Sequence, residues 1–309
     1  MLEYLAGRFG RMLVTLWVIT TVVFLATRVT GNPIDFLMPE GLDPQSRDAM
    51  IAYFGLDQPL WTQYSNFWKS LVEGEFGLGL MERRSVAVIF GERVWRSVSL
   101  LAATLVVTVG VGVPLGIVSA VWRNTSLGNA VLLLAFLGYA VPNFVLAILF
   151  LLIFSFSLQW LPSAGSATLA HYVMPVLALS AFFVASLVRY TRNSMLDVLS
   201  QDYIRTARAK GLSEKAVILR HGLRNALIPV ITVIGLQMTT LVSGAVVVET
   251  VFAWNGIGDL LVGATLRRDY PVIQFGVLIV ACTVVTINLL IDLIYSAVDP
   301  RVRLGGAAT

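Results

Sequence analysis

The chain has few cysteines, histidines and charged residues. Its 309 residues include one cysteine, Cys282, and two histidines, so an internal disulfide is excluded and no metal site is expected. Charged residues make up 13% of the sequence and hydrophobic residues 57%, whereas an average soluble domain carries about 25% charged residues. The net charge of +4 is too small to indicate nucleic-acid binding. This composition predicts a polytopic membrane protein.

Motifs for catalysis are also missing. No G-x-x-x-x-G-K followed by Ser or Thr occurs, so we expect no ATP binding and no catalytic residue in this chain. An intramembrane enzyme would need a nucleophile with a base, or metal ligands, at membrane depth, where neither His171 nor His221 is placed. An ion-coupled secondary transporter usually shows paired buried carboxylates. Only Asp292 is a candidate for one, so that class stays the weaker alternative, and co-purification with an ATPase subunit would exclude it.

Six apolar stretches are long enough to cross a membrane, which takes about 20 residues. We place them near residues 9–29, 98–122, 129–157, 172–191, 229–250 and 272–296. The first follows Arg8 and Arg11 as a signal peptide would, but its apolar core is longer and no small-x-small cleavage site follows, so we expect it to be retained. The predicted fold class is therefore an all-α polytopic membrane protein with six transmembrane helices.

The spans divide the chain into four regions. They are residues 1–29, the N-terminus and first helix; 30–97, an extracytoplasmic segment with amphipathic helices; 98–296, a five-helix transmembrane core; and 297–309, a tail. Lys and Arg are concentrated in the short loops on the side of the N-terminus. The positive-inside rule therefore predicts that both termini lie in the cytoplasm.

Within the long connection of residues 30–97, the run DQPLWTQYSNFWKSLV predicts an amphipathic helix. Pro59 suits its first position. One face would carry Leu60, Trp61, Tyr64, Trp68 and Leu71. Because Trp and Tyr favour the membrane interface, we expect this helix to cap the outer membrane face or a partner's rim. Contact with substrate is the alternative.

The longest mostly polar stretch after residue 100 runs from Ser200 to Pro229. It contains the basic loop, residues 200–224, within the wider connection 192–228. Six basic residues accompany only Asp202 and Glu214. The loop is predicted to form two short helices, with Ser200 capping the first, Gly211 ending it in a left-handed conformation and Ser213 capping the second. Ala216, Leu219 and Leu223 lie at helical spacing in the second helix. Such a bent knob would fit a groove of another protein, and an ordinary solvated loop is the alternative.

The run YIRTARAKGLSEKAVILRHGLRNALIP resembles the coupling loop of permease subunits in ATP-driven importers of the dipeptide, oligopeptide, glutathione and nickel group. The wider family has Glu-Ala-Ala, three residues, Gly, and later Ile-x-Leu-Pro. Here the triplet is Arg205-Thr206-Ala207, the glycine is Gly211, and Leu223-Arg224 stands at the Leu-Pro position. These departures are typical of the peptide branch. The resemblance covers nearly the whole chain, including VVVETVFAWNGIGDLLVGATLRRDYPVIQ.

The resemblance implies the type I ABC importer permease fold and a set of partners. These are a second, similar permease, two cytoplasmic ATPase subunits that bind ATP and Mg, and an extracytoplasmic solute-binding protein. It also implies that the basic loop contacts an ATPase subunit. The residues it assigns to that contact are Tyr203, Arg205, Thr206, Ala207, Arg208, Lys210, Gly211, Leu212, Ser213, Glu214 and Arg220. The runs FGLGLMERRSV and RRDYPVIQ resemble glutathione and dipeptide permeases most. Short peptides are therefore favoured as substrates over nickel or another small solute.

Polar residues and helix breakers inside the spans are candidates for a translocation pathway. Pro142 and Asn143 interrupt the third span, and their freed backbone groups must be satisfied within protein or beside a cavity. Gln237 and Ser243 lie in the fifth span, where polar side chains either hold helices together or line the path. Glu249 ends that span and could pair with Arg267 or Arg268 at a gate.

The segment 251–271 is too apolar for an exposed loop and too broken for a span. In the permeases that this chain resembles, the region dips back into the membrane near the outer gate. Trp254, Asn255, Gly256 and Gly258 would form its turn. The alternative is an interfacial turn with Trp254 among the aromatic residues that face the lipid headgroups.

Overall fold

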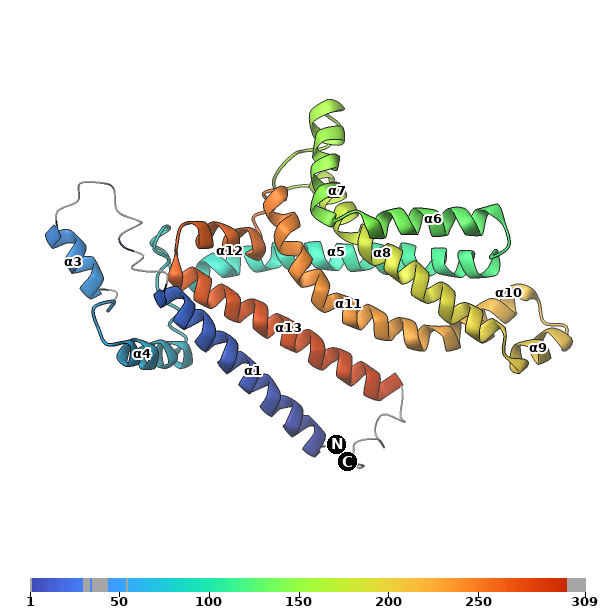
Figure 1. Ribbon diagram of the computed structural model, residues 1–309, viewed down its shortest axis with the longest axis horizontal. Coiled ribbons are helices and arrows are strands. Elements are labelled where there is room, and N and C mark those ends of the chain that lie inside the picture. The colour runs from blue at the N-terminus through green and yellow to red at the C-terminus, as the bar shows by residue number, and fades with distance from the viewer. Residues whose placement is uncertain (1, 30–33, 35–43, 54, 299–309) are drawn as a thin grey trace. The chain divides into compact units, whose positions relative to one another are not determined.

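The structure is a computed structural model that describes residues 2–29, 34, 44–53 and 55–298, and these residues are almost entirely helical (Figure 1). One isolated β-bridge joins Leu78 to Ser85. The chain divides into two compact units. The first comprises Arg96–Asn255 and Thr286–Thr309 with Met1, and the second comprises Leu2–Trp95 and Gly256–Val285. Most of the predicted tail, and residues 35–43 of the long connection, lie outside the described residues.

Five helices among the described residues are long and apolar enough to span a membrane, and there are six if a bent helix pair counts as one span. They confirm the predicted number and order of spans. The five are α1 (Leu2–Val29), α5 (Val86–Val121), α8 (Leu169–Leu199), α11 (Arg224–Val251) and α13 (Tyr270–Val298). Several run past the predicted ends, because polar residues extend a helix beyond its apolar part. Helix α5 begins at Val86, so the last residues of the segment 30–97 form its first turns.

The third predicted span is not one continuous helix. It consists of α6 (Ser126–Ala140) followed by α7 (Asn143–Phe150) and the π-helix η1 (Leu151–Ser157), and the two arms meet at 97°. Val141 is extended, with φ −93° and ψ 123°, and Pro142 precedes the first residue of α7. Proline disfavours a helical conformation in the residue before it, which explains the break. The predicted interruption at Pro142 and Asn143 is confirmed.

Helix α8 is the packing centre of the first unit, where it contacts α6, α7 and α11 (Figure 1). Met174, Leu179 and Phe183 of α8 share a buried cluster with Leu241 and Val248 of α11. Helix α5 approaches α8 through two glycines four residues apart, an arrangement that lets membrane helices pack closely. A Cβ on Gly116 would lie 2.5 Å from Cβ of Thr191.

In the second unit, α4 (Leu60–Glu73) packs on α1. The hydroxyls of Thr21 and Tyr64 lie 2.8 Å apart, and the ring of Phe24 contacts those of Tyr64 and Phe67. The predicted helix is confirmed. Trp61 on its predicted apolar face is 76% exposed, while Phe67 also contacts α1.

The remaining helices of the second unit are α3 (Pro44–Tyr53) and α12 (Ile257–Leu266). Ile257 of α12 belongs to a buried cluster with Phe90 and Phe275, whose rings meet edge to face at 4.9 Å. Segment 251–271 therefore contains a short apolar helix, stabilised by aromatic packing within its own unit.

Candidate functional site

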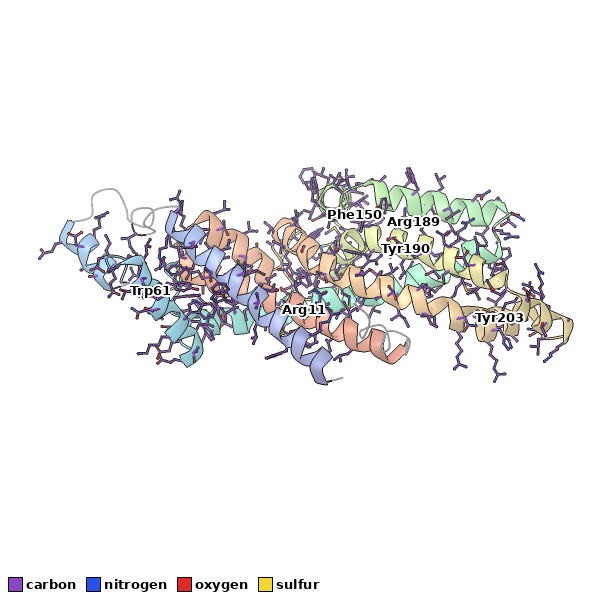
Figure 2. All side chains as sticks on the ribbon, turned by 60° about the horizontal axis from the view of Figure 1, so that its bottom comes forward. Arg11, Trp61, Phe150, Arg189, Tyr190 and Tyr203 are labelled. Atoms are coloured by element: carbon purple, nitrogen blue, oxygen red, sulfur yellow. The ribbon has the colours of Figure 1, made fainter. Side chains whose placement is uncertain are left out.

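The first half of the basic loop is α9 (Asp202–Ala209), which has an apolar core of its own. Ile204 and Ala207 are buried against Val217 and Leu199. Ala207 is thus enclosed by the loop, whereas Tyr203 projects from α9 (Figure 2) and its hydroxyl accepts a hydrogen bond from Nδ2 of Asn225 at 3.0 Å. A loop with its own core keeps its shape without a partner, as a preformed docking element requires.

The bend after α9 has the predicted geometry. Gly211 has φ +78°, and its N–H donates to the carbonyl of Arg208 at 2.9 Å. Ser213 accepts a hydrogen bond from the backbone of Ala216 and so caps the next helix. The predicted role of Ser200 is wrong. Its Oγ donates to the carbonyl of Asp197 at the end of α8, and Gln201 precedes α9.

The second half of the loop is not a separate short helix. The short α10 (Glu214–Ala216) leads into the π-helix η2 (Val217–Leu223), which continues directly into α11. A π-helix has a longer turn than an α-helix, so positions at α-helical spacing leave the buried face. Leu219 of the predicted apolar positions is 48% exposed, while Val217, which was not among them, is fully buried.

Charges in the loop are partly paired inside it. Arg208 donates two hydrogen bonds to Glu214, Nε to Oε2 at 3.1 Å and Nη2 to Oε1 at 2.6 Å. These bonds raise the pKa of Arg208 above its usual value. Arg205 lies 3.3 Å from Asp202, with its side chain 75% exposed. Within the described chain no carboxylate lies within 4.0 Å of Arg220, Lys210 or Lys215. These three cations are available to a partner.

The other predicted contact residues lie on the loop surface. Leu212, next to the Gly211 bend, is 42% exposed, as is Tyr203. Thr206 is exposed, and its hydroxyl donates to the carbonyl of Asp202 at 3.0 Å. The loop thus presents exposed apolar side chains among basic ones, a composition found where proteins bind partners.

A cavity of about 370 Å³ lies beside the loop, and the sequence did not point to it. Arg123, Arg205 and Arg208 line it together with Leu196 and Leu199. Arg123 follows α5, far from the loop in sequence. Only the fold reveals this basic concavity.

The pathway candidates of the first unit lie at the start of α7 and along α11. Nδ2 of Asn143 lies against α11, where a Cβ on Gly244 would be 3.1 Å from it. Both polar side-chain atoms of Gln237 are buried and have no hydrogen-bond partner in the part of the chain that the structure describes. Ser243 is exposed, and Glu249 is 1% exposed near the end of α11. The side chain of Asp292 lies outside the described residues.

The turn after α11 is built around Trp254, which is fully buried. Its indole Nε1 donates to the carbonyl of Arg96 at 2.9 Å, and its ring meets Tyr172 edge to face at 4.5 Å. The alternative of a lipid-facing Trp254 is therefore wrong. Asn255 has φ +57° and Ala253 φ +43°, so the turn's left-handed positions fall on these two residues. The predicted glycines follow it, Gly256 before α12 and Gly258 buried within α12.

Comparison with known proteins identifies the class. Residues 112–304 match the family described as "Binding-protein-dependent transport system inner membrane component". The chain belongs to this family, the membrane-embedded permease subunits of ABC importers. It is a multi-pass inner membrane protein, and permeases of this family work with ATPase subunits, membrane subunits and a binding protein. The classes of intramembrane enzyme and ion-coupled transporter are thereby set aside.

Relatives among curated proteins include glutathione transport system permeases. The chain is 41% identical over 304 residues to the permease protein GsiC of Escherichia coli (strain K12), covering 98% of this chain and 99% of that one. It is 40% identical over the same length to GsiC of Shigella flexneri serotype 5b (strain 8401).

Among solved structures, the inward-facing MetNI methionine ABC transporter matches 69% of this chain and 97% of its own chain, with a TM-score of 0.59 and 18% identity. That match supports the type I permease fold.

Proposed function

We propose that the chain forms one half of the transmembrane pathway of an importer for short peptides, of the dipeptide, oligopeptide or glutathione kind. The observation that carries this proposal is the 41% identity to a glutathione permease along 98% of the chain. A likeness that extends over both the transmembrane core and the long connection favours a common substrate class. Nickel or another small solute is the alternative substrate. It would apply if this chain shared only its architecture, and not its substrate class, with the glutathione permeases.

In this proposal, ATP and Mg are bound by partner ATPase subunits, and the basic loop passes their movement to the membrane helices. The loop's own core, the Gly211 bend and the exposed Leu212 support a preformed element that enters a groove. Arg220, Lys210 and Lys215 would meet acidic or carbonyl groups there. Charges at the rim of an interface contribute modestly to affinity and more to orientation.

The complete importer would contain a second, homologous permease, two ATPase subunits or domains, and an extracytoplasmic solute-binding protein, within membrane lipid. Both termini and the basic loop would face the cytoplasm, and the long connection would face outward. The concentration of Lys and Arg in the basic loop supports this orientation.

The test is uptake by liposomes that contain the complete importer with its binding protein outside and ATP inside. We expect uptake of labelled glutathione or a dipeptide that requires both ATP and the binding protein. Arg220→Glu should reduce uptake several-fold, while Arg47→Glu, in the long connection, should not. Transport of nickel without transport of any peptide would contradict the proposed substrate class.

A further inference from the structure

The second unit contains a cavity of about 390 Å³ that the proposed pathway does not use. It lies among the end of α1, the helix α4 with its flanking turns, and the start of α13. Phe76 and Phe275 form one wall, with ring centroids 4.2 Å apart. Binding sites for small molecules typically enclose about 300–1,000 Å³ and combine an apolar wall with a few polar groups. The size and the wall of this cavity fit that description.

Two opposite charges line the cavity, and neither forms an ion pair with another of the described residues. Nε of Arg28 is buried without a hydrogen-bond partner, and its guanidinium lies 4.9 Å from the ring centroid of Phe24. No carboxylate of the described residues is within 4.0 Å of Arg28, and no cation is within that distance of Glu75. A neighbouring carboxylate outside the cavity, Glu73, is by contrast paired with Lys69. An unpaired cation and an unpaired anion in one cavity suit a ligand that carries both charges.

Amide side chains supply further polar groups of the lining. Nε2 of Gln63 donates to the carbonyls of Gln58, at 2.7 Å, and Leu56, at 3.3 Å. Its Oε1 is buried without a partner and is left as an acceptor. Gln274 donates from Nε2 to Oγ1 of Thr27 at 2.9 Å, which orients a second amide at the cavity wall. Buried polar groups are normally hydrogen-bonded, so the orphaned Oε1 points to a donor on a ligand. The amide N–H of a peptide bond is such a donor.

We propose that this cavity is an accessory binding site for a short peptide with free termini. Arg28 binds its carboxylate, Glu75 its ammonium group, and Gln63 accepts from a peptide N–H. This site rests on the proposed function. The proposed function places the long connection on the outer face, where substrate leaves the solute-binding protein. The site would hold a peptide on the outer face independently of the binding protein.

The test measures binding to the complete importer in nanodiscs without its solute-binding protein, by isothermal titration calorimetry. The probes are trialanine, trialanine amide, which lacks the carboxylate, and N-acetyltrialanine, which lacks the ammonium. Because charge-assisted hydrogen bonds are the strong ones, wild type should bind trialanine about tenfold more tightly than either analogue. Arg28→Gln should abolish the preference over the amide, and Glu75→Gln the preference over the acetylated peptide.

Arg47→Gln and Glu73→Gln are the matched controls, since both residues lie in the same connection and outside the lining. Both should keep the wild-type preferences. Absence of trialanine binding, or equal binding of all three probes by wild type, would overturn the site even if the variants misfold. If liposomes take up peptides through the binding protein while nanodiscs bind no trialanine, the site fails and the proposed function stands. Binding that depends on Arg28 without any peptide uptake would support the site and contradict the proposed function.

Discussion

Arg208 and Glu214 lie on opposite sides of the Gly211 bend and are joined by two hydrogen bonds, at 3.1 and 2.6 Å. The pair connects the end of α9 to the first residue of α10. A bidentate arginine–carboxylate pair has a fixed geometry, whereas a lysine would act as a single point charge. The pair therefore holds the angle between the two parts of the basic loop, so Arg208 is a positioning residue as well as a candidate contact.

Exchanging the two charges tests this role. Glu214→Arg alone should place two cations together, disturb the bend and lower substrate-stimulated ATP hydrolysis several-fold. The double variant Arg208→Glu with Glu214→Arg should recover most of the activity, because the pair forms again in reverse. The measurement is ATPase activity of the reconstituted importer with loaded binding protein. If Arg208 acts by contacting the ATPase subunit, the double variant will remain as impaired as the single one.

Gly211 should tolerate asparagine better than valine. Its φ of +78° is a conformation that costs a β-carbon residue about 1–2 kcal/mol, and asparagine is among the residues that adopt it most readily. No atom lies within 4 Å of a Cβ built at this position, so backbone strain alone decides the outcome. We expect Gly211→Val to insert normally but to lose uptake and ATPase association, and Gly211→Asn to keep most of both. Normal transport by a well-expressed valine variant would show that the bend is not a mechanical joint.

Trp254 should act as the anchor of the turn after α11. Trp254→Phe removes the hydrogen bond to Arg96 but keeps an aromatic ring, and should cost about 1 kcal/mol. Trp254→Ala also leaves a cavity beside Leu100 and Val176, and should cost about 3–5 kcal/mol. Thermal unfolding in detergent measures both. Equal melting temperatures for wild type and Trp254→Ala would contradict the packing described.

Asp269 gives a pH-dependent prediction. It is 3% exposed and accepts a hydrogen bond from the N–H of Met81 at 3.1 Å, and burial raises the pKa of its carboxyl above the usual range. The folded state therefore binds the proton more tightly than the unfolded state, and stability from this group is lost as pH rises through the folded pKa.

The melting temperature of wild type, relative to Asp269→Asn, should accordingly rise as the pH falls from 7 towards 4. Asp269→Ala, which removes the acceptor for Met81, should lie below both at neutral pH. A difference between wild type and Asp269→Asn that stays constant over this range would exclude the proton linkage.

Local sequence signals predicted much of this structure. Apolar length located all six spans, and Pro142 marked the break in the third because the restriction that proline imposes is local. The left-handed Gly211 and the capping Ser213 were predictable for the same reason. The exposure of Leu219 was not, since helical spacing does not reveal a π-helix such as η2.

Features that depend on distant segments could not be predicted. Trp254 is buried by Arg96 and Tyr172, which come from other helices, and its sequence neighbours equally fit a lipid-facing turn. The accessory cavity joins Arg28 to Glu75 across the long connection. Neither residue lies in a motif, so only the fold shows that they line one space.

Contact between the basic loop and an ATPase subunit is the central step of the proposed coupling. A photo-crosslinking amino acid at Leu212, which is 42% exposed, tests that contact in intact membranes, with Trp61, 76% exposed in the long connection, as the matched position. The account predicts a crosslink to the ATPase subunit from position 212 and none from position 61. Absence of the crosslink at 212 in an importer that hydrolyses ATP, or equal crosslinking from both positions, would contradict it.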